Sequence, residues 1–341
     1  MTNGTFLVMP PSIIAAGKND WQYPARTEEW VWVALQELAI DTPFFQFVSF
    51  PWATLIDLQR RELTDRAQAL RREIVELGPK TTLVRATICQ HIWMKDLIPV
   101  FVKLGITDLF WPHATHGETE IDGIRIHPFP LFPVRGFEGL ELRRDIPTSQ
   151  TRDLLFNFAG AYDPQGYLTP VREWIFDLPP SPDYTIQKRA NWHYESDVYL
   201  RQILRKPVEQ NADRDQGNHA LEYDAMLSRS LFTLCPSGSG PNSIRFWEAI
   251  MFGSIPVLLS DRLRLPGSDR DWHDGIVRIP ETEIAVAELP GRLAKVAQDE
   301  EKVAQLQAHL KMLASIYILD AARTLVLPIS EMDYIRKVTQ A

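Results

Sequence analysis

The segment from Leu231 to Pro266 constrains the fold more than any other part of this chain. An apolar run typical of a strand, Leu231–Cys235, leads into a loop of proline, serine and glycine. A helical pattern then covers Ser243–Phe252, and a second apolar run, Ile255–Leu259, follows directly. A strand, a short turn, a helix and another strand form the repeating unit of parallel sheets. The pattern therefore predicts an α/β protein.

The loop in this unit has the composition of an anion-binding turn. Glycines let backbone N–H groups approach a ligand closely, and the start of the following helix adds partial positive charge. The guanidinium of Arg245 can pair with phosphate oxygens, and Glu248, about one turn deeper on the same face, can accept hydrogen bonds from ribose hydroxyls. The alternative is a glycine-rich turn beside a surface Arg–Glu pair. The candidate nucleotide contacts are Ser237, Gly238, Ser239, Gly240, Asn242, Ser243, Arg245 and Glu248.

Strand and helix patterns alternate along the rest of the chain, which predicts two Rossmann-like domains. A length of 341 residues also suits two domains better than one. Residues 130–152 show little periodicity, so we place the linker there. Strands are expected over residues 5–9, 44–50, 82–89, 108–111, 121–129, 154–159, 184–187, 231–235, 255–259 and 276–279. Helices are expected over residues 28–39, 53–77, 94–104, 196–205, 220–229, 243–252 and 283–337.

Taken together, the motif residues resemble the exostosin family, glycosyltransferase family 47. The pattern of that family is a strand, a Pro-x-Gly loop, Ser-x-Arg, Glu-Ala, Gly-x-(Ile/Val)-Pro-Val, and Ser-Asp followed by Leu-Pro. The resemblance covers residues 150–285 and is weaker over the first domain. The residues that carry it are Pro236, Gly238, Ser243, Arg245, Glu248, Ala249, Gly253, Ile255, Pro256, Val257, Ser260, Asp261, Leu265 and Pro266.

The resemblance implies a GT-B fold, in which two Rossmann-like domains face each other across the active-site cleft. We expect an acceptor domain over residues 1–145, a nucleotide-sugar-binding domain over 146–320, and a helix over 321–341 that crosses back onto the first domain. The resemblance also implies a UDP-sugar donor, inversion at the anomeric centre and no metal cofactor, because a helix dipole and basic side chains stabilise the departing diphosphate. Arg172 and Arg189 are further candidates for contact with the donor.

An inverting transfer needs a general base near the acceptor hydroxyl. Ligands of α/β proteins gather at the carboxyl ends of strands, and residues 90–91 and 113–118 follow two expected strands. Family members commonly have an aspartate after the histidine of the second loop, where this chain has Ala114. The alternatives are structural or surface histidines, or a metal site, for which no third ligand is evident. The catalytic candidates are His113, His116 and Glu118.

Composition excludes several other classes of protein. The net charge is -8 and no basic stripe is present, so we expect no nucleic-acid partner. The two cysteines lack the spacing of a zinc site or a disulfide framework, which fits reduced thiols in the cytoplasm. No uninterrupted apolar run approaches about 18 residues, so we expect no transmembrane helix. The sequence leaves open the alternative that the protein also contacts the inner face of the membrane.

These features predict a glycosyltransferase that moves a sugar from a nucleotide donor, with UDP expected, to a glycan or glycolipid acceptor. One alternative is a non-catalytic subunit that keeps the nucleotide site within a polysaccharide-synthesising complex. Ala114 favours this alternative, whereas the retained Arg245 and Glu248 argue against it. Another alternative is a transferase that uses a different nucleotide sugar, such as a GDP-sugar.

Overall fold

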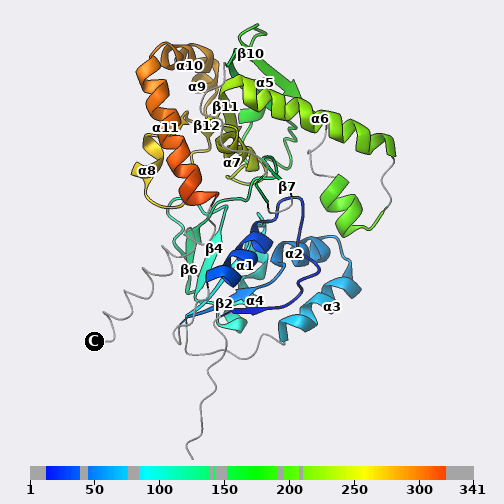
Figure 1. The fold of residues 1–341 in the computed structure, drawn as a ribbon. Helices are drawn as coiled ribbons and strands as arrows, with labels where there is room; N and C mark the ends of the chain where they lie inside the picture. Colours follow the sequence, from blue (N-terminus) through cyan, green and yellow to red (C-terminus); the bar gives the residue numbers. More distant parts are fainter. Residues whose placement is uncertain are drawn as a thin grey trace, which may run out of the picture.

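The computed structural model describes residues 13–38, 45–75, 84–138, 141–142, 152–190, 196–206 and 210–319. Its described part contains a six-stranded sheet and a five-stranded sheet, each flanked by helices, which lie one above the other in Figure 1. Nearly all strand pairs in both sheets are parallel. The predicted fold class, GT-B with two facing Rossmann-like domains, is therefore confirmed.

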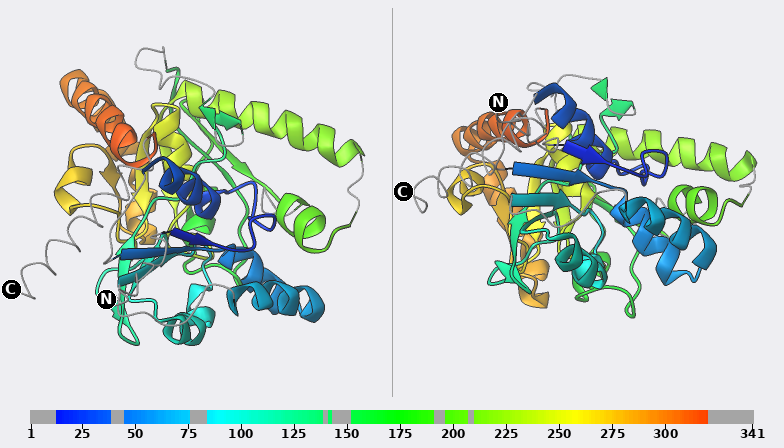
Figure 2. Two further views of the ribbon diagram at one scale, coloured as in Figure 1. Left: turned by 60° about the horizontal axis from the view of Figure 1, so that its bottom comes forward. Right: turned by 90° about the horizontal axis from the view of Figure 1, so that it is seen from below.

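The first sheet has the strand order β1-β2-β3-β4-β6-β5. Strands β2, β3 and β4 are buried along their whole length because helices cover both faces. Figure 2 shows α1 on one face and α2 to α4 on the other. The elements are β1 (Ile13–Ala15), α1 (Thr27–Leu38), β2 (Phe45–Ser49), α2 (Trp52–Arg60), α3 (Thr64–Val75), β3 (Val84–Ile88), η1 (Met94–Leu97), α4 (Ile98–Leu104), β4 (Asp108–Trp111), β5 (Glu120–Ile121) and β6 (Ile124–Pro128).

Three expectations for this domain need correction or fall outside the structure. The single helix expected over 53–77 is two helices, because the chain turns at Glu62 (φ 58°) and the amide of Leu63 donates back to the carbonyl of Leu58. The strand expected over 121–129 is the hairpin β5–β6, whose turn residues Asp122 and Gly123 both have positive φ. The strand expected over 5–9 lies outside the described residues.

The second sheet has the order β10-β9-β11-β12-β13, so the connections leave β9 and β11 in opposite directions. Adjacent loops that diverge in this way form the crevice where α/β sheets bind ligands. The elements are β9 (Leu154–Gly160), α5 (Val171–Phe176), β10 (Tyr184–Lys188), η2 (Ser196–Ile203), α6 (Gln210–Arg229), β11 (Ser230–Pro236), α7 (Ile244–Met251), β12 (Ile255–Leu259), α8 (Asp269–His273), β13 (Val277–Arg278), α9 (Glu283–Ala287), α10 (Leu289–Ala297) and α11 (Glu300–Tyr317).

The helical tract expected over 283–337 is α9, α10 and α11 within the described residues. It is interrupted because the side chain of Asp299 accepts a hydrogen bond from the amide of Lys302 and starts a new helix. The helix expected over 321–341 lies outside the described residues. A short hairpin of β7 (Phe137–Glu138) and β8 (Glu141–Leu142) occupies the region predicted as the linker.

The two domains are joined by direct backbone pairing. Thr115 of the first domain forms an antiparallel bridge with Leu263 of the second. The amide of Arg264 donates to the carbonyl of Ala114 at 2.9 Å. One buried apolar cluster also continues across the junction, from Trp30 in α1 to Trp247 in α7. This pairing and packing hold the cleft between the domains in a defined geometry.

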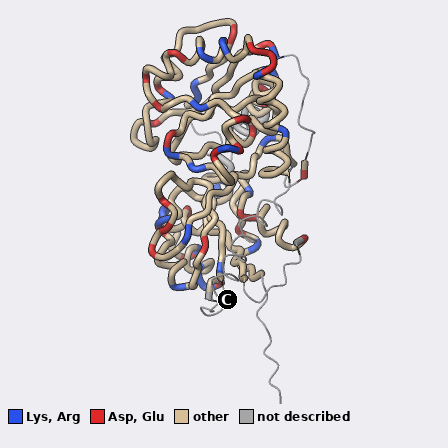
Figure 3. Tube along the Cα trace, turned by 90° about the vertical axis from the view of Figure 1, so that its left-hand side faces the viewer, with Lys and Arg blue, Asp and Glu red and all other residues tan. Residues whose placement is uncertain are grey.

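Charged residues of both signs alternate along the two domains (Figure 3). In the described part of the chain, no helix combines the length and apolar composition that crossing a membrane requires.

Candidate functional site

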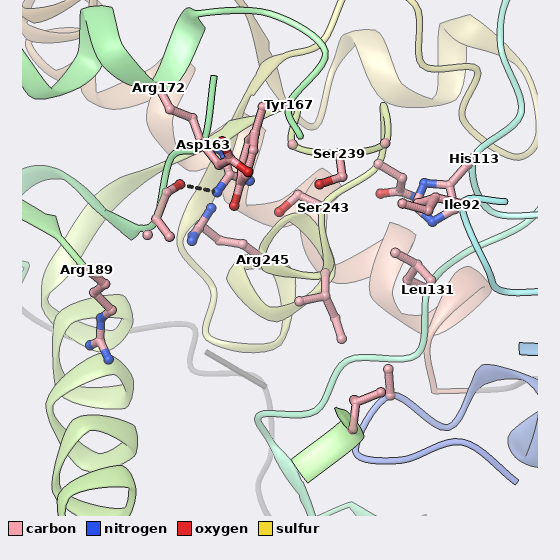
Figure 4. Close-up of a pocket in the computed structure, with 18 of the residues that line it drawn as sticks. Ile92, His113, Leu131, Asp163, Tyr167, Arg172, Arg189, Ser239, Ser243 and Arg245 are labelled. Atoms are coloured by element: carbon pink, nitrogen blue, oxygen red, sulfur yellow. Dashed lines mark hydrogen bonds between the residues drawn. The ribbon is translucent and has the colours of Figure 1, made fainter. Parts of the chain in front are cut away.

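A cavity of about 660 Å³ lies between the two domains. The second domain contributes the loops that follow β9 and β11, together with side chains from α5, α6 and α7. The first domain contributes segments near 22–25, 90–92, 113 and 131, together with Asp57 of α2. In Figure 4, Arg172 and Arg245 lie beside each other, and His113 lies on the opposite side of the serine-containing loop. The cavity therefore occupies the crevice that the divergent strands create.

Arg172 and Arg245 form a pair of buried guanidinium groups. Nε and Nη1 of Arg172 donate to the carbonyls of Ser237 and Ala161, at 2.9 and 3.0 Å. Arg245 donates through Nη2 to the carbonyl of Ala159, whereas its Nε and Nη1 have no hydrogen-bond partner among the described residues. Both groups therefore contact uncharged backbone oxygens and leave donors for a ligand.

The electrostatics of this pair favour a bound anion. The guanidiniums of Arg245 and Arg172 lie 4.7 and 5.8 Å from the centre of the Phe158 ring. Burial and the adjacent charge of Arg245 lower the pKa of Arg172 to about 10. Arg189 also lines the cavity, and burial lowers its pKa as well. Cations that are buried close together are stabilised by an anion between them, and a diphosphate has the matching charge.

The loop between β11 and α7 approaches both the arginines and the first domain closely. A Cβ on Gly238 would lie 2.8 Å from Nη2 of Arg172. A Cβ on Gly240 would lie 2.6 Å from Cγ2 of Ile92 and 2.7 Å from Nδ1 of His113. The space available therefore favours glycine most strongly at position 240, whereas at position 238 the end of the Arg172 side chain would have to shift. Gly238, Ser239, Gly240 and Ser243 all line the cavity, as the sequence predicts for nucleotide contacts.

Two predicted contacts in this loop have other partners in the structure. The hydroxyl of Ser237 lies outside the cavity and donates to the carboxylate of Glu281, because the side chain turns toward the loop after β13. Asn242 lines the cavity, but its amide donates to the carbonyl of Pro112 at 2.8 Å and its oxygen accepts from the indole of Trp247 at 3.1 Å. Asn242 therefore joins the two domains.

Glu248 is buried at the base of the cavity, with 1% of its surface exposed. Its Oε1 accepts from the amide of Arg135 at 3.2 Å, and its Oε2 accepts from the hydroxyl of Tyr223 at 3.0 Å. The same Arg135 forms an ion pair with Asp224 on α6. These bonds fix the orientation of the carboxylate beside the cavity.

Of the catalytic candidates in the loop after β4, the structure brings only His113 to the cavity. Its Nδ1 is buried and has no hydrogen-bond partner among the described residues. Burial and the neighbouring His91 lower its pKa to about 3, so the imidazole is neutral at physiological pH. His113 can therefore accept a hydrogen bond from a ligand hydroxyl, but it is a weak proton acceptor.

His116 and Glu118 do not reach the cavity. The amide of His116 donates to the carbonyl of Arg262 at 3.0 Å, and this pairing between domains turns its side chain to the surface. The carboxylate of Glu118 accepts from Nζ of Lys95 at 2.5 Å on the outside of the first domain. The pairing with residues 262–264 could not be anticipated from the spacing of the loop.

The sequence analysis missed the polar group that faces the cavity from the first domain. Asp57 accepts from the side chain of Gln22 at 2.5 Å, and Nε2 of His91 lies 3.3 Å from the other carboxylate oxygen. The amide of Trp93 donates to Nδ1 of His91, so Nε2 carries the proton and donates to Asp57. His91 was among the residues that the sequence places directly after a strand, where ligands gather. Asp57 lies within an expected helix, and nothing in the local pattern indicated that it faces a ligand.

The sequence is similar to known proteins over much of its length. The sequence profile described as the Exostosin GT47 domain matches residues 114–293, which is more than half of the chain. A probable glucuronoxylan glucuronosyltransferase of Arabidopsis thaliana is 38% identical over 195 residues, which cover 57% of this chain and 36% of that protein. An exostosin-1 homolog of Caenorhabditis elegans is 27% identical over 166 residues, which cover 47% of this chain and 42% of that protein.

The chain thus matches less than half of the length of these curated relatives. Among solved structures, Anabaena HepE in complex with UDP and glucose aligns with 89% of this chain and 81% of its own, at 10% identity and a TM-score of 0.41.

Proposed function

The chain belongs to the exostosin GT47 family, and on this basis we propose that it is a glycosyltransferase that uses a nucleotide sugar, with UDP as the nucleotide, to glycosylate a glycan or glycolipid. The observation that carries the proposal is the pair Arg172 and Arg245 in the cavity between the domains. Two nitrogens of Arg245 lack partners among the described residues, and the hydrogen bonds that the two guanidiniums do make there go to uncharged backbone carbonyls. A diphosphate supplies the missing acceptors and charge.

The donor would lie with its diphosphate against Arg172, Arg245 and the glycine-rich loop, and with its ribose at Glu248. Arg189 would contact the diphosphate or the base from the edge of the cavity. Guanidinium groups and backbone amides that are already in place can stabilise the charge that develops on the departing diphosphate. Their number in this cavity supports a reaction that needs no metal ion.

We assign the acceptor base to Asp57, with His91 and Gln22 as the residues that position it. In an inverting transfer the acceptor oxygen attacks the anomeric carbon, its proton passes to the carboxylate of Asp57, and the bond from the anomeric carbon to the diphosphate oxygen breaks. The electron pair of that bond leaves with the nucleoside diphosphate. His113 would then accept a hydrogen bond from a hydroxyl of the donor sugar.

A donor panel tests the proposal. The protein is incubated with UDP-sugars and GDP-sugars, and release of the nucleoside diphosphate is measured with and without oligosaccharide acceptors. We expect turnover with at least one UDP-sugar and inverted product stereochemistry by NMR. Donor binding with no turnover for any sugar would instead support a non-catalytic subunit. Release of GDP from GDP-sugars, with no release of UDP from UDP-sugars, would show that the donor nucleotide is GDP.

A further inference from the structure

A second recess, of about 330 Å³, lies on the surface of the first domain where it meets η2. It is formed by the segment 18–29, Arg66 of α3 and residues 201–205. Figures 1 and 2 both show the dark blue segment next to the short green helix η2. A volume in this range is typical of sites for small molecules or for one part of a longer ligand.

The recess concentrates positive charge in a chain whose net charge is -8. Five basic side chains and two acidic ones line it. One acidic residue, Glu29, already pairs with Arg26 at 2.9 Å. Arg66 donates to backbone carbonyls of Gln202 and Ile203. The basic residues are Lys18, Arg26, Arg66, Arg201 and Arg205.

Trp21 provides independent evidence for a ligand in this recess. It lines the recess, is only 7% exposed, and its buried Nε1–H has no hydrogen-bond acceptor among the described residues. An unsatisfied buried donor of this kind costs free energy. Its ring is held against Trp32, with the centroids 6.0 Å apart, and Nζ of Lys18 lies 5.2 Å from the centre of the same Trp32 ring.

The recess and the main cavity lie on opposite sides of one wall. Gln22 faces the main cavity, whereas its neighbours Trp21 and Tyr23 line the recess. Helix η2 is shared in the same way, because Tyr199 lines the cavity and Gln202 lines the recess. The side chain of Gln202 fixes this wall by bonding the carbonyl of Trp21 and the amide of Tyr23, at 2.5 and 3.1 Å. The recess therefore adjoins the side of the cavity that the first domain and η2 form.

We propose that this recess binds carboxylate-bearing sugar units of an acidic glycan acceptor, away from the unit that is glycosylated. That the bound glycan is the acceptor rests on the proposed function, whereas the binding itself does not. Guanidinium groups pair with carboxylates, and Trp21 and Tyr23 also line the recess beside them. The recess is concave, which fits a sugar unit better than a membrane surface.

The test is titration of the full chain with a short oligogalacturonate, with and without saturating UDP, and with its methyl ester as the uncharged control. We expect the acid form to bind and the ester to bind at least about tenfold more weakly. The variant Lys18→Gln/Arg205→Gln should weaken binding of the acid at least about fivefold. Lys295→Gln/Lys311→Gln, which removes the same charge from exposed positions of α10 and α11, should leave it unchanged.

Trp21→Phe keeps an aromatic ring but removes the unsatisfied donor, so it should weaken binding of the glycan. Because it also shortens a buried side chain, its melting temperature is measured alongside and UDP affinity serves as the control for folding. Absence of glycan binding, equal binding of the ester, or full affinity in both recess variants would overturn the proposal. Binding only to vesicles of anionic phospholipid would overturn it in favour of a lipid. UDP binding should be the same in the wild type and in all these variants. If the wild type binds the glycan but not UDP, the proposed function is contradicted and the recess proposal is not.

Discussion

The hydroxyl of Tyr223 on α6 donates to Oε2 of Glu248 on α7 at 3.0 Å, beneath the cavity between the domains. Both side chains are buried. The bond holds the carboxylate in the orientation in which we place the ribose. A ligand-binding carboxylate held in this way needs little rearrangement when the nucleotide binds.

Tyr223→Phe should therefore lower stability by about 1–3 kcal/mol, because a buried carboxylate loses a donor. Glu248→Gln keeps an acceptor for the amide of Arg135 and can donate to Tyr223, so it should fold like the wild type. It should still weaken UDP about tenfold, because the charged acceptor of the ribose hydroxyls is lost. Urea unfolding and calorimetric titration measure the two effects. Wild-type UDP affinity in Glu248→Gln would place the ribose elsewhere.

Gly240→Ala should disturb the contact between the two domains. The added Cβ would lie 2.6 Å from Ile92 and 2.7 Å from His113, both in the first domain. Overpacking of this kind typically costs about 1–3 kcal/mol. Melting temperature and UDP affinity should both fall, whereas Gly291→Ala in α10, where nothing lies within 4 Å of the new Cβ, should leave UDP affinity unchanged and should not lower the melting temperature. Unchanged binding in Gly240→Ala would mean that the cleft is wider than the structure shows.

Asp57→Asn should lower kcat by about 10²-fold or more and leave UDP affinity unchanged, because the base acts only on the acceptor. His91→Gln should have a smaller effect on kcat, since it removes a positioning bond and keeps the carboxylate. His113→Gln should raise KM for the donor sugar more than it lowers kcat. Steady-state kinetics with varied donor and acceptor separate these effects. A larger loss of kcat in His113→Gln than in Asp57→Asn would show that His113, and not Asp57, is the general base.

Glu28 gives the fold a specific pH dependence. Burial raises the pKa of this carboxyl from 4.5 to about 8, while the amides of Gln90 and Ala53 donate to it and oppose the shift. The folded state therefore holds a proton that the unfolded state releases above about pH 4.5, so stability should fall as pH rises from 4.5 toward 8 and level off above it.

Glu28→Gln removes the titrating carboxyl, so the variant should not show this fall in stability. Its free energy of unfolding relative to that of the wild type should therefore increase between pH 4.5 and pH 8, by on the order of a few kcal/mol. Urea unfolding at pH 5 and at pH 8.5 measures the difference. Parallel pH profiles for the two proteins would show that Glu28 is ionised in the folded state.

The donor half of the site could be predicted from sequence because its parts are local. The loop 238–243, Arg245 and Glu248 belong to a single strand–turn–helix unit, and helical spacing sets their relative positions. Arg172 and Arg189 required the family resemblance, since they reach the cavity from a different helix and a different strand end.

The acceptor half could not be predicted in the same way. Asp57, His91 and Gln22 are far apart in sequence and are brought together by tertiary packing, in which α2 lies against η1, the element that follows β3. His116 and Glu118 had the right residue types but are turned outward by the pairing of residues 114–116 with residues 262–264. Local patterns carry no information about such contacts between domains.

Calorimetric titration with UDP tests the central claim most directly. Arg245→Gln retains a donor for the carbonyl of Ala159 but removes the charge and the two nitrogens that lack partners among the described residues. The account predicts that the wild type binds UDP, that Arg245→Gln binds it about 10- to 100-fold more weakly, and that Arg292→Gln, an exposed residue on α10, binds like the wild type. Absence of UDP binding by the wild type, or equal affinity in Arg245→Gln, would contradict it.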